Sequence, residues 1–415
     1  MKIWIFNHYA SPPDGAGGTR HYDFGEVLAA AGHDVTIFAS SFSHFSRGED
    51  RLADGERSRV QDIGGVRFVW VRTTPYSAND YRRLMNMLSY AAGVIWVQRK
   101  FPRPDVVVGS CVHPLAVVAA FAVGAARRVP FVFEVRDLWP QTLIDMGALR
   151  ENGAAAVTLR VIERYLYRRS RTVISLLPGA ADYLTRAGVP VSKIIHVPNG
   201  VARRTVSGLP AGSRARALTD QIERWRAAGY LVAGYVGSHG PANGLDVLIE
   251  AARVLRDRGT GNIMTVFVGD GPDKERCMRL ARQYALDTIV FFAPVAKEAV
   301  PGVLQSLDVA LFPLRDIPVF RYGLSSNKLF DYLASGRPVV SACGVPDNPV
   351  RLSRGGICVP AEAPEAVADA LARLASAGAA GRYVIGERGR AWVYEHHDVT
   401  KLADRFLRAV GGTAR

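Results

Sequence analysis

The chain has 415 residues, 48% of them apolar, and this length exceeds what one ordinary hydrophobic core holds, so we expect two domains of similar size. No stretch of about 20 residues is free of charges and helix breakers, and the first residues lack the features of a signal peptide, which argues against a membrane-spanning helix and predicts a cytoplasmic protein. The formal net charge of +14 is spread evenly over both halves with no basic tail or block, which favours anionic small molecules or an anionic membrane surface over nucleic acid as a partner.

The first half alternates short β-branched runs with segments of helical period, among them Tyr22–Ala31, Leu115–Ala126 and Ala154–Arg168. This alternation predicts a parallel sheet with helices on both faces, which is a Rossmann-like, doubly wound domain. The strands expected in this half are Ile3–Phe6, Val35–Phe38, Val66–Val71, Val106–Val108, Phe131–Val135 and Val173–Leu177.

A glycine-rich segment, Ser11–Thr19, follows the first expected strand and precedes a helix. Its glycines Gly15, Gly17 and Gly18 would let backbone N–H groups approach an anion at the positive end of the helix dipole. The spacing matches neither the dinucleotide-binding nor the P-loop fingerprint, so a plain flexible loop is an equally good interpretation.

The segment Arg82–Lys100 has basic ends, aromatic residues and a strongly apolar middle. It could lie on an anionic bilayer as an interfacial helix, but its evenly apolar middle favours a core helix that covers the first sheet. The exposed arginines leave peripheral contact with an anionic membrane as a further expectation, which would place the protein at the inner face of the membrane.

Polar residues follow two first-half strands at their carboxyl ends, where open α/β sheets bind ligands. His113 lies in the run Ser110–Pro114 and could face a ligand there, although a lone histidine is more often structural. Arg136 and Asp137 follow the next strand. They are either acceptor-side residues or a buried pair that braces Trp139.

Residues 203–219 show no hydrophobic period and are rich in Ser, Gly, Pro, Ala and Arg, as expected of a linker. The β/α alternation restarts after them, so we expect a second Rossmann-like domain that faces the first, with a ligand held between the two. We place the domains at residues 1–203 and 204–398, while a last helix, about 399–415, could pack back on the first. The strands expected in the second half are Leu231–Val236, Ile263–Val268, Ile289–Phe292, Val309–Phe312 and Val339–Ser341.

The second half repeats the order of strand, polar glycine loop and helix. The loop Gly237–Gly244 precedes a helix expected at Leu245–Arg256. Such a loop at a helix start is suited to hold phosphate. Its candidate contacts are Gly237, Ser238, His239 and Asn243.

The next strand ends in Gly269-Asp270-Gly-Pro272. Pro272 suits the first turn of a helix, and Asp270 would either cap that helix or face the ligand. We favour the cap.

The run Pro313–Val340 contains Ser325-Ser-Asn-Lys-Leu329 and Asp331-Tyr-Leu-Ala-Ser-Gly-Arg-Pro-Val-Val340. It resembles the donor site of the retaining family-4 glycosyltransferases, which have the GT-B fold of two facing Rossmann-like domains. Within that family the chain is similar to bacterial O-antigen and capsule enzymes of the fucosamine-transferase type. Further matches are Ala31-Gly-His-Asp-Val-Thr36, Glu134-Val-Arg-Asp-Leu-Trp-Pro140, Val197-Pro-Asn-Gly200 and Gly269-Asp-Gly-Pro272.

The resemblance implies roles for several residues. Asp331 would grip the ribose hydroxyls of the donor, since a carboxylate can accept two hydrogen bonds from a cis-diol. Ser326, Asn327 and Lys328 would meet the diphosphate at a helix start, although a solvated surface lysine is the alternative for Lys328. His113 would lie near the sugar. The donor-binding set also includes Gly17, Gly18, Gly237, Ser238, His239, Asn243, Gly269 and Asp270, and the acceptor side would use Arg20, Arg136 and Asp137.

The implied reaction moves a hexose or N-acetylhexosamine-type sugar, with retention, from a UDP-sugar to a glycan or lipid-linked acceptor. The donor's own phosphate would accept the acceptor's proton, so the protein would supply positioning and charge stabilisation. The four cysteines lie far apart and form no metal-binding or disulfide pattern. We therefore expect buried thiols, no metal, and no cofactor beyond the nucleotide-sugar, which is a co-substrate.

The chain departs from the family pattern at the donor site. The first of two expected acids is Gly323, and the Arg and Lys of the second glycine loop are replaced by Ser238 or His239 and by Asn243. These losses keep two alternatives open, a nucleotide-sugar 2-epimerase and a catalytically silent sugar-nucleotide-binding subunit. An epimerase would need a second carboxylate beside Asp331, and none is evident.

Overall fold

The computed structural model describes the chain except for residues 15–16, 44–49, 78–79, 204–208, 261 and 413–415. The chain divides into two compact units. Unit 1 comprises Met1–Ala202 together with Val399–Arg415, and unit 2 comprises Arg203–Asp398. Each unit is a parallel α/β domain, as the alternating pattern predicts.

Unit 1 contains an eight-stranded sheet in the order β3-β4-β2-β1-β5-β6-β7-β8. All pairs are parallel except β3 with β4. The strands are β1 Lys2–Phe6, β2 Asp34–Ser40, β3 Ser58–Ile63, β4 Val66–Val71, β5 Val106–Cys111, β6 Phe131–Val135, β7 Thr172–Ser175 and β8 Ile194–His196. The helices are α1 Arg20–Ala30, α2 Tyr81–Val97, α3 Pro114–Arg127, α4 Gln141–Asp145, α5 Ala154–Arg169, α6 Ala180–Arg186 and α15 Val399–Gly411, with short 3₁₀ turns η1 Gln98–Lys100 and η2 Val191–Lys193.

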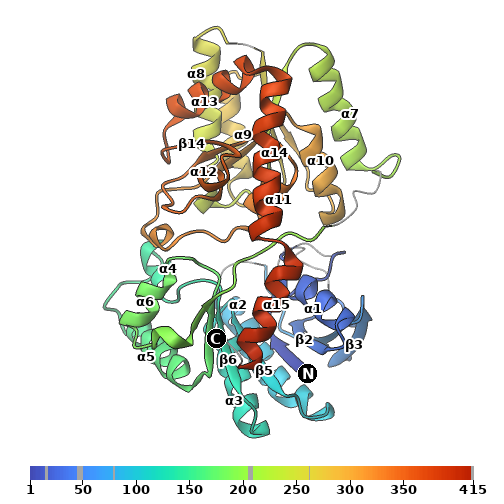
Figure 1. The fold of residues 1–415 in the computed structure, drawn as a ribbon, viewed down its shortest axis with the longest axis vertical. Helices are drawn as coiled ribbons and strands as arrows, with labels where there is room; N and C mark the ends of the chain where they lie inside the picture. The colour runs from blue at the N-terminus through green and yellow to red at the C-terminus, as the bar shows by residue number, and fades with distance from the viewer. Residues whose placement is uncertain (15–16, 44–49, 78–79, 204–208, 261, 413–415) are drawn as a thin grey trace. The chain divides into compact units, whose positions relative to one another are not determined.

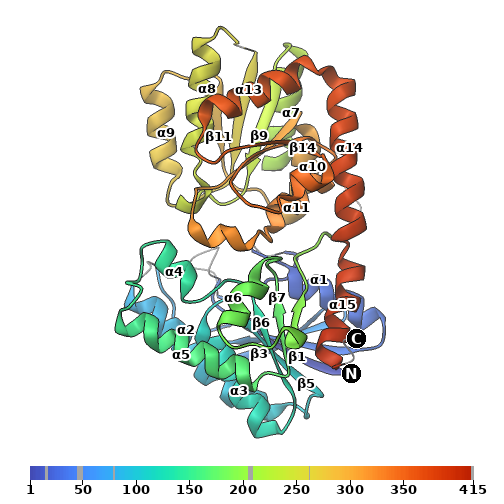
Figure 2. The same ribbon diagram turned by 60° about the vertical axis from the view of Figure 1, so that its left-hand side comes forward.

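The strand order sends connections in two directions from β1, so right-handed crossovers place helices on both faces of the sheet. Helices α1 and α15 cover one face, and α2, α3 and α5 cover the other (Figures 1 and 2). The six strands expected in this half are present. The antiparallel edge strand β3 was not predicted, because its sequence lacks an apolar run. Its two end residues are half-buried and the four between them are exposed.

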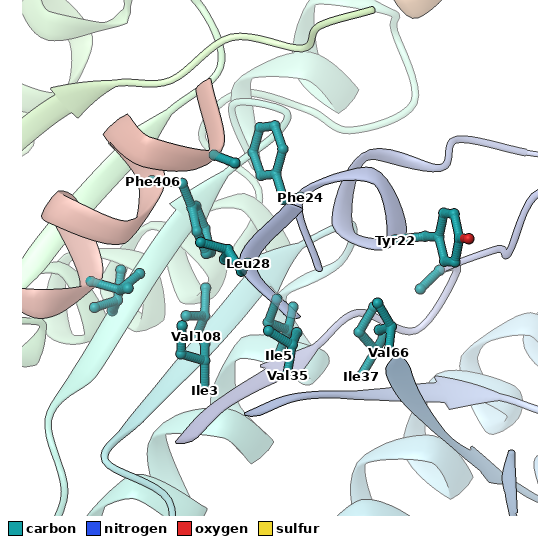
Figure 3. Close-up of a cluster of buried hydrophobic side chains, with 14 of the residues drawn as sticks. Ile3, Ile5, Tyr22, Phe24, Leu28, Val35, Ile37, Val66, Val108 and Phe406 are labelled. Atoms are coloured by element: carbon teal, nitrogen blue, oxygen red, sulfur yellow. The ribbon is translucent and has the colours of Figure 1, made fainter. Parts of the chain in front are cut away.

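The last helix belongs to unit 1. Phe406 of α15 is fully buried, and its ring centroid lies 5.5 Å from that of Phe24 in α1. Figure 3 shows both rings beside Leu28, above Ile3 and Ile5 of the central strand. A helix from the end of the chain thus completes the core of the first unit.

Unit 2 contains a six-stranded, wholly parallel sheet in the order β11-β10-β9-β12-β13-β14. The strands are β9 Leu231–Val236, β10 Ile263–Val268, β11 Ile289–Phe292, β12 Val309–Pro313, β13 Val339–Ala342 and β14 Gly356–Val359. The helices are α7 Arg214–Ala227, α8 Asp246–Asp257, α9 Lys274–Gln283, α10 Val300–Ser306, α11 Asn327–Ala334, α12 Pro349–Ser353, α13 Pro364–Ser376 and α14 Gly378–His396, with 3₁₀ turns η3 Pro241–Asn243, η4 Lys297–Ala299 and η5 Pro318–Tyr322.

The expected linker at residues 203–219 is partly wrong. Helix α7 begins at Arg214, and the hydroxyl of Ser213 caps it by accepting the N–H of Arg216 at 3.2 Å. Its buried residues include Leu218 and Ile222. The helical period was missed because charged residues fill the exposed face of this helix.

Candidate functional site

Two glycine loops, Gly237–Gly244 after β9 and Gly269–Pro272 after β10, are joined by backbone hydrogen bonds. The N–H of His239 donates to the carbonyl of Asp270 at 2.8 Å, and the N–H of Asp273 donates to the carbonyl of His239 at 2.9 Å. A Cβ on Gly269 would lie 2.0 Å from the carbonyl oxygen of Gly237. Gly269 also has a φ of 144°. Only glycine fits at this crossing, which explains the glycine run in the sequence.

Lys328 reaches from the start of α11 into the first of these loops. Its Nζ donates to the hydroxyl of Tyr235 at 2.6 Å and to Oδ1 of Asn243 at 2.8 Å. A Cβ on Gly237 would lie 3.0 Å from Cε of Lys328, so the glycine makes room for the lysine. The loss of hydration in this half-buried place lowers the pKa of Lys328 to about 7. The alternative of a solvated surface lysine is therefore wrong.

Asn243 links Lys328 to the loop backbone. Its side-chain N–H donates to the carbonyl of Ser238 at 2.9 Å while its Oδ1 accepts from Lys328. The positive Gly244 φ of 57° then turns the chain into α8. The structure thus brings Gly237, Ser238, Asn243 and Lys328 together, although they are up to 91 positions apart in the numbering of the printed sequence.

The N-terminal turn of α11 begins where the motif predicts. Ser326 is the N-cap residue, with extended backbone angles, and Asn327 is the first helical residue. The side chain of Ser326 makes no capping hydrogen bond. The first backbone N–H groups of a helix have no partner inside the helix, so they are available to an anion.

Asp331 lies one turn further along α11, on the same side as Lys328. Its carboxylate pairs with the ammonium of Lys297, from η4, at 2.5 Å. The side chains of Asp331 and Lys297 are 25% and 28% exposed, so solvent and a ligand can both reach the pair. Sequence reasoning missed Lys297, because the residues around it give no indication that it pairs with Asp331, which is 34 positions away.

His239 is fully buried and cannot replace the missing loop arginine as a cation. Its ring lies among those of Tyr235, Phe267 and Phe291, with centroids 5.8 to 6.3 Å away. Burial, with the charge of Lys274 nearby, lowers its pKa to about 4. The imidazole is thus neutral at physiological pH, and in the described part of the chain neither ring nitrogen has a hydrogen-bond partner.

The expectation that Asp270 caps the following helix is wrong. Helix α9 begins only at Lys274, and its N-cap residue is Asp273. The carboxylate of Asp270 accepts from the N–H of Gly271 instead, at 2.9 Å. Gly271, with a φ of 155°, and Pro272 precede the N-cap of α9. Asp270 is exposed, so a role toward a ligand stays a prediction.

In unit 1, His113 is a buried helix cap with a second histidine as its partner. It is the N-cap residue of α3, and its Nδ1 accepts from the N–H of Ala116 at 3.3 Å. Its Nε2 lies 2.6 Å from Nδ1 of His8, which follows β1. Because Nδ1 of His113 accepts, its proton is on Nε2 and is donated to His8. Burial lowers the pKa of His113 to about 3, so the ring is neutral.

His8 is the residue that sequence reasoning missed here. Its ring stacks on that of Tyr90 of α2, with centroids 4.3 Å apart. Since its Nδ1 accepts from His113, the proton of a neutral His8 lies on Nε2. The only signal available was its place at the carboxyl end of the first strand, beside the glycine segment.

Arg20 is held inside the protein. Its guanidinium donates to the carboxylate of Glu134 at 2.9 Å and to the carbonyls of Val197 and Pro198. Burial opposes ionisation of Glu134, but the adjacent charges of His21 and Arg20 hold its pKa well below the usual range. These bonds anchor the Val197–Gly200 segment to α1, and we assign Arg20 this structural role rather than an acceptor contact.

Four further candidates lie at loop positions. Arg136 is half-buried and Asp137 is exposed directly after β6, so they are not a buried pair. Gly17 and Gly18 precede the Thr19 N-cap of α1, and Gly17 has a φ of 130°. Gly15 lies outside the described residues.

The described residues contain no group of three or more His, Cys, Asp or Glu side chains that could hold a metal ion. Cys111, Cys277 and Cys343 are buried thiols, as expected, and Cys358 is half-buried.

Comparisons with known proteins match both units. The model of a glycosyl transferase 4-like domain matches residues 15–200, and the model of glycosyl transferases group 1 matches residues 231–377. A relative from Escherichia coli named as the colanic acid biosynthesis glycosyl transferase WcaI is 24% identical over 75% of this chain and 76% of its own. The D-inositol 3-phosphate glycosyltransferase of Actinosynnema mirum is 26% identical over 91% of this chain and 89% of its own.

Solved structures share the fold of the whole chain. The sucrose-phosphate synthase of Thermosynechococcus elongatus has a TM-score of 0.74 and 17% identity, and the alignment covers 100% of both chains. Anabaena HepE in complex with UDP-glucose has a TM-score of 0.68 and 14% identity, over 99% of this chain and 100% of that one.

Proposed function

The chain belongs to the family-4 glycosyltransferases with the GT-B fold, and on this premise we propose that it moves a hexose or N-acetylhexosamine-type sugar from a UDP-sugar to an acceptor. The acceptor is a glycan or a lipid-linked glycan of surface-polysaccharide synthesis. The name of the relative WcaI, which refers to colanic acid, supports this class of product. The complex of HepE with UDP-glucose supports UDP as the nucleotide.

The observation that carries the proposal is the position of Lys328. Its ammonium lies between Tyr235 and Asn243, beside the glycine loop and at the start of α11. A diphosphate at this point would meet the first N–H groups of α11, the backbone of the loop and the Lys328 cation. His239 is neutral, so the neutralisation of the leaving diphosphate falls mainly on Lys328 and the helix start.

Asp331 would hold the ribose of the same nucleotide. Helical spacing places it one turn beyond Lys328, which suits a ribose attached to the diphosphate. Its partner Lys297 orients the carboxylate in the free protein. One carboxylate oxygen can accept from Lys297 while the other accepts from a ribose hydroxyl.

Transfer with retention needs no basic side chain in this proposal. The bond from the anomeric carbon to the leaving phosphate oxygen breaks, and the acceptor oxygen attacks from the same face of the sugar. The phosphate takes the acceptor's proton, and the protein stabilises the developing negative charge. His113, through its bond to His8, would shape the sugar side as a neutral hydrogen-bonding pair, with Arg136 and Asp137 on the acceptor side.

The first test compares Lys328→Ala and Asp331→Ala with the unchanged protein. Loss of the lysine should lower turnover about 100-fold, the scale of one oxyanion-type contact, and loss of the aspartate should mainly weaken UDP binding. The measurements are UDP affinity by calorimetry and slow nucleotide release from UDP-sugars without acceptor. Asp369→Ala and Lys401→Ala change exposed residues of the same types and serve as controls.

Intact affinity and turnover in both site variants would refute the donor site. The same assay separates the other interpretations, since an altered sugar indicates an epimerase and tight binding without turnover indicates a silent subunit. GDP-sugars tested in parallel check the choice of UDP.

A further inference from the structure

Two helices of unit 1 expose apolar stripes to solvent. On α2, the side chains of Tyr81, Leu84, Met85, Leu88 and Trp96 are 43% to 70% exposed. On α5, those of Val157, Val161 and Tyr165 are 47% to 61% exposed. Most of these residues are three, four or eight positions apart, which puts each set on one side of its helix, opposite the buried side.

These stripes lie on the same side of unit 1. Helix α3 contacts both α2 and α5 on one face of the sheet. The ring of Phe121 on α3 meets that of Tyr165 edge-on, with centroids 5.7 Å apart. We call the outward side of these three helices the α2–α5 face.

The exposed charged residues on helices α2, α3 and α5 are all basic, while the exposed acids beside these helices include Asp80 and Glu151. Helices α2, α3 and α5 together contain one acidic residue, Glu163, which is buried and accepts hydrogen bonds from Tyr167 and Tyr183. Exposed basic residues on or beside the helices are Arg82, Arg99, Lys100, Arg164, Arg168 and Arg169.

Cations also lie over the outward aromatic rings. Lys100 Nζ is 4.9 Å from the centre of the Trp96 ring, and the guanidinium carbon of Arg169 is 5.4 Å from that of Tyr165. Amphipathic rings beside cations are typical of side chains that settle at the level of lipid headgroups. No helix in the described part of the chain could itself span a bilayer.

We propose that the α2–α5 face docks on an anionic phospholipid bilayer, with the apolar stripes at the acyl boundary and the basic residues against the headgroups. We choose an anionic bilayer as the partner because its negative headgroups complement the basic residues of the α2–α5 face. A second copy of the chain would place the same basic side chains against one another with no exposed acid on the three helices to pair with them. The proposal deepens the proposed function, because a lipid-linked acceptor resides in such a bilayer, but its test needs no sugar transfer.

The test is co-sedimentation of the whole protein with vesicles of phosphatidylcholine, alone or with about 30% phosphatidylglycerol, as an anionic surface. We expect binding to the anionic vesicles that weakens as salt rises, and little binding to the neutral ones. Met85→Glu with Leu88→Glu, on α2, and separately Val161→Glu, on α5, should each weaken binding about tenfold or more, since they put charge at the acyl boundary.

Matched controls come from unit 2. Leu352 and Val384 are 55% and 49% exposed, so Leu352→Glu and Val384→Glu make the same change elsewhere and should leave vesicle binding unchanged. Arg164→Gln with Arg168→Gln should lower binding to anionic vesicles and flatten its salt dependence. Far-ultraviolet circular dichroism and UDP affinity check that each variant is folded.

The proposal is overturned if the unchanged protein ignores anionic vesicles, or if the unit 2 controls weaken binding as much as the face variants. It is also overturned if the unchanged protein forms a dimer in size-exclusion chromatography, the variants of the α2–α5 face abolish that dimer, and the unchanged protein does not bind vesicles. A protein that binds vesicles but not UDP would refute the proposed function alone.

Discussion

At the scale of single residues, the candidate side chains of the two units include two neutral histidines and one lysine with a lowered pKa. His113 and His239 have pKa values lowered to about 3 and about 4. Neither ring becomes protonated near pH 7, so neither serves as a cation or as a general acid there. Lys328, by contrast, has a pKa lowered to about 7, so its charge responds to a ligand at neutral pH.

Binding of UDP at pH 8 should therefore be coupled to proton uptake. At pH 8 most Lys328 side chains of the free protein are neutral, and a bound diphosphate favours the ammonium, so uptake should approach about one proton per UDP. At pH 6 the lysine is already charged and uptake from it should vanish. Calorimetry in buffers with different ionisation enthalpies measures the number of protons.

Lys328→Met is the matched variant, because it keeps the length of the side chain and removes the titrating group. Equal uptake at pH 8 by this variant and the unchanged protein would show that another group takes the proton. The same lowered pKa means that Lys328 reduces stability as pH falls from about 10.5 toward about 7, since the unfolded chain binds its proton more readily.

At the scale of elements, the last helix shows how a distant segment completes a core. Helix α15 has a buried stripe that includes Leu402, Phe406 and Val410, packed against the strands and α1 of unit 1 (Figure 3). The sequence predicts an amphipathic helix there but leaves open which half it joins. The pairing depends on complementary shape, with the ring of Phe406 against that of Phe24.

Phe406→Ala should destabilise unit 1 by about 3–5 kcal/mol, the usual cost of removing a fully buried phenylalanine. Urea unfolding followed by tryptophan fluorescence should show an earlier transition for unit 1 and an unchanged one for unit 2. Tyr383→Ala on α14, where the side chain is 61% exposed, is the control and should change stability by less than about 0.5 kcal/mol. An unshifted first transition in Phe406→Ala would show that α15 contributes little to the core.

At the scale of the whole molecule, two compact units with separate sheets should unfold as separate transitions. UDP should shift only the transition of unit 2, because the proposed contacts of Lys328, Asp331 and the glycine loops all belong to that unit. At a UDP concentration about 100 times the Kd, the expected gain is about 2.7 kcal/mol. The experiment is calorimetric melting with and without UDP.

The shift should persist in EDTA, since the proposed neutralisation of the diphosphate uses Lys328 and the start of α11. Loss of the UDP effect in EDTA with recovery on adding Mg²⁺ would contradict the expected metal independence. A shift of the unit 1 transition instead would place the nucleotide in the other unit.

The sequence alone predicted eleven of the fourteen strands in the described part of the chain, the two α/β halves, a helix that begins near Ser326 and the GT-B family, and each of these is confirmed. The short strands β8 and β14 were not predicted. Such features are readable because strands buried on both faces need apolar runs, and because a helix start or a glycine crossing constrains residues that are neighbours in the chain. For the same reason the strand β3 and helix α7, whose apolar periods are weak, were missed or cut short.

Only the tertiary structure decided which side chains meet. The pairs Lys297 with Asp331 and His8 with His113 join residues 34 and 105 positions apart, and Arg20 proved to be internal through Glu134. The sequence favoured a core position for the middle of the segment Arg82–Lys100, whereas the structure gives its helix, α2, one buried side and one exposed apolar side. Contacts of this kind depend on how sheets and helices pack in three dimensions. They cannot be predicted from the spacing of apolar residues along the sequence.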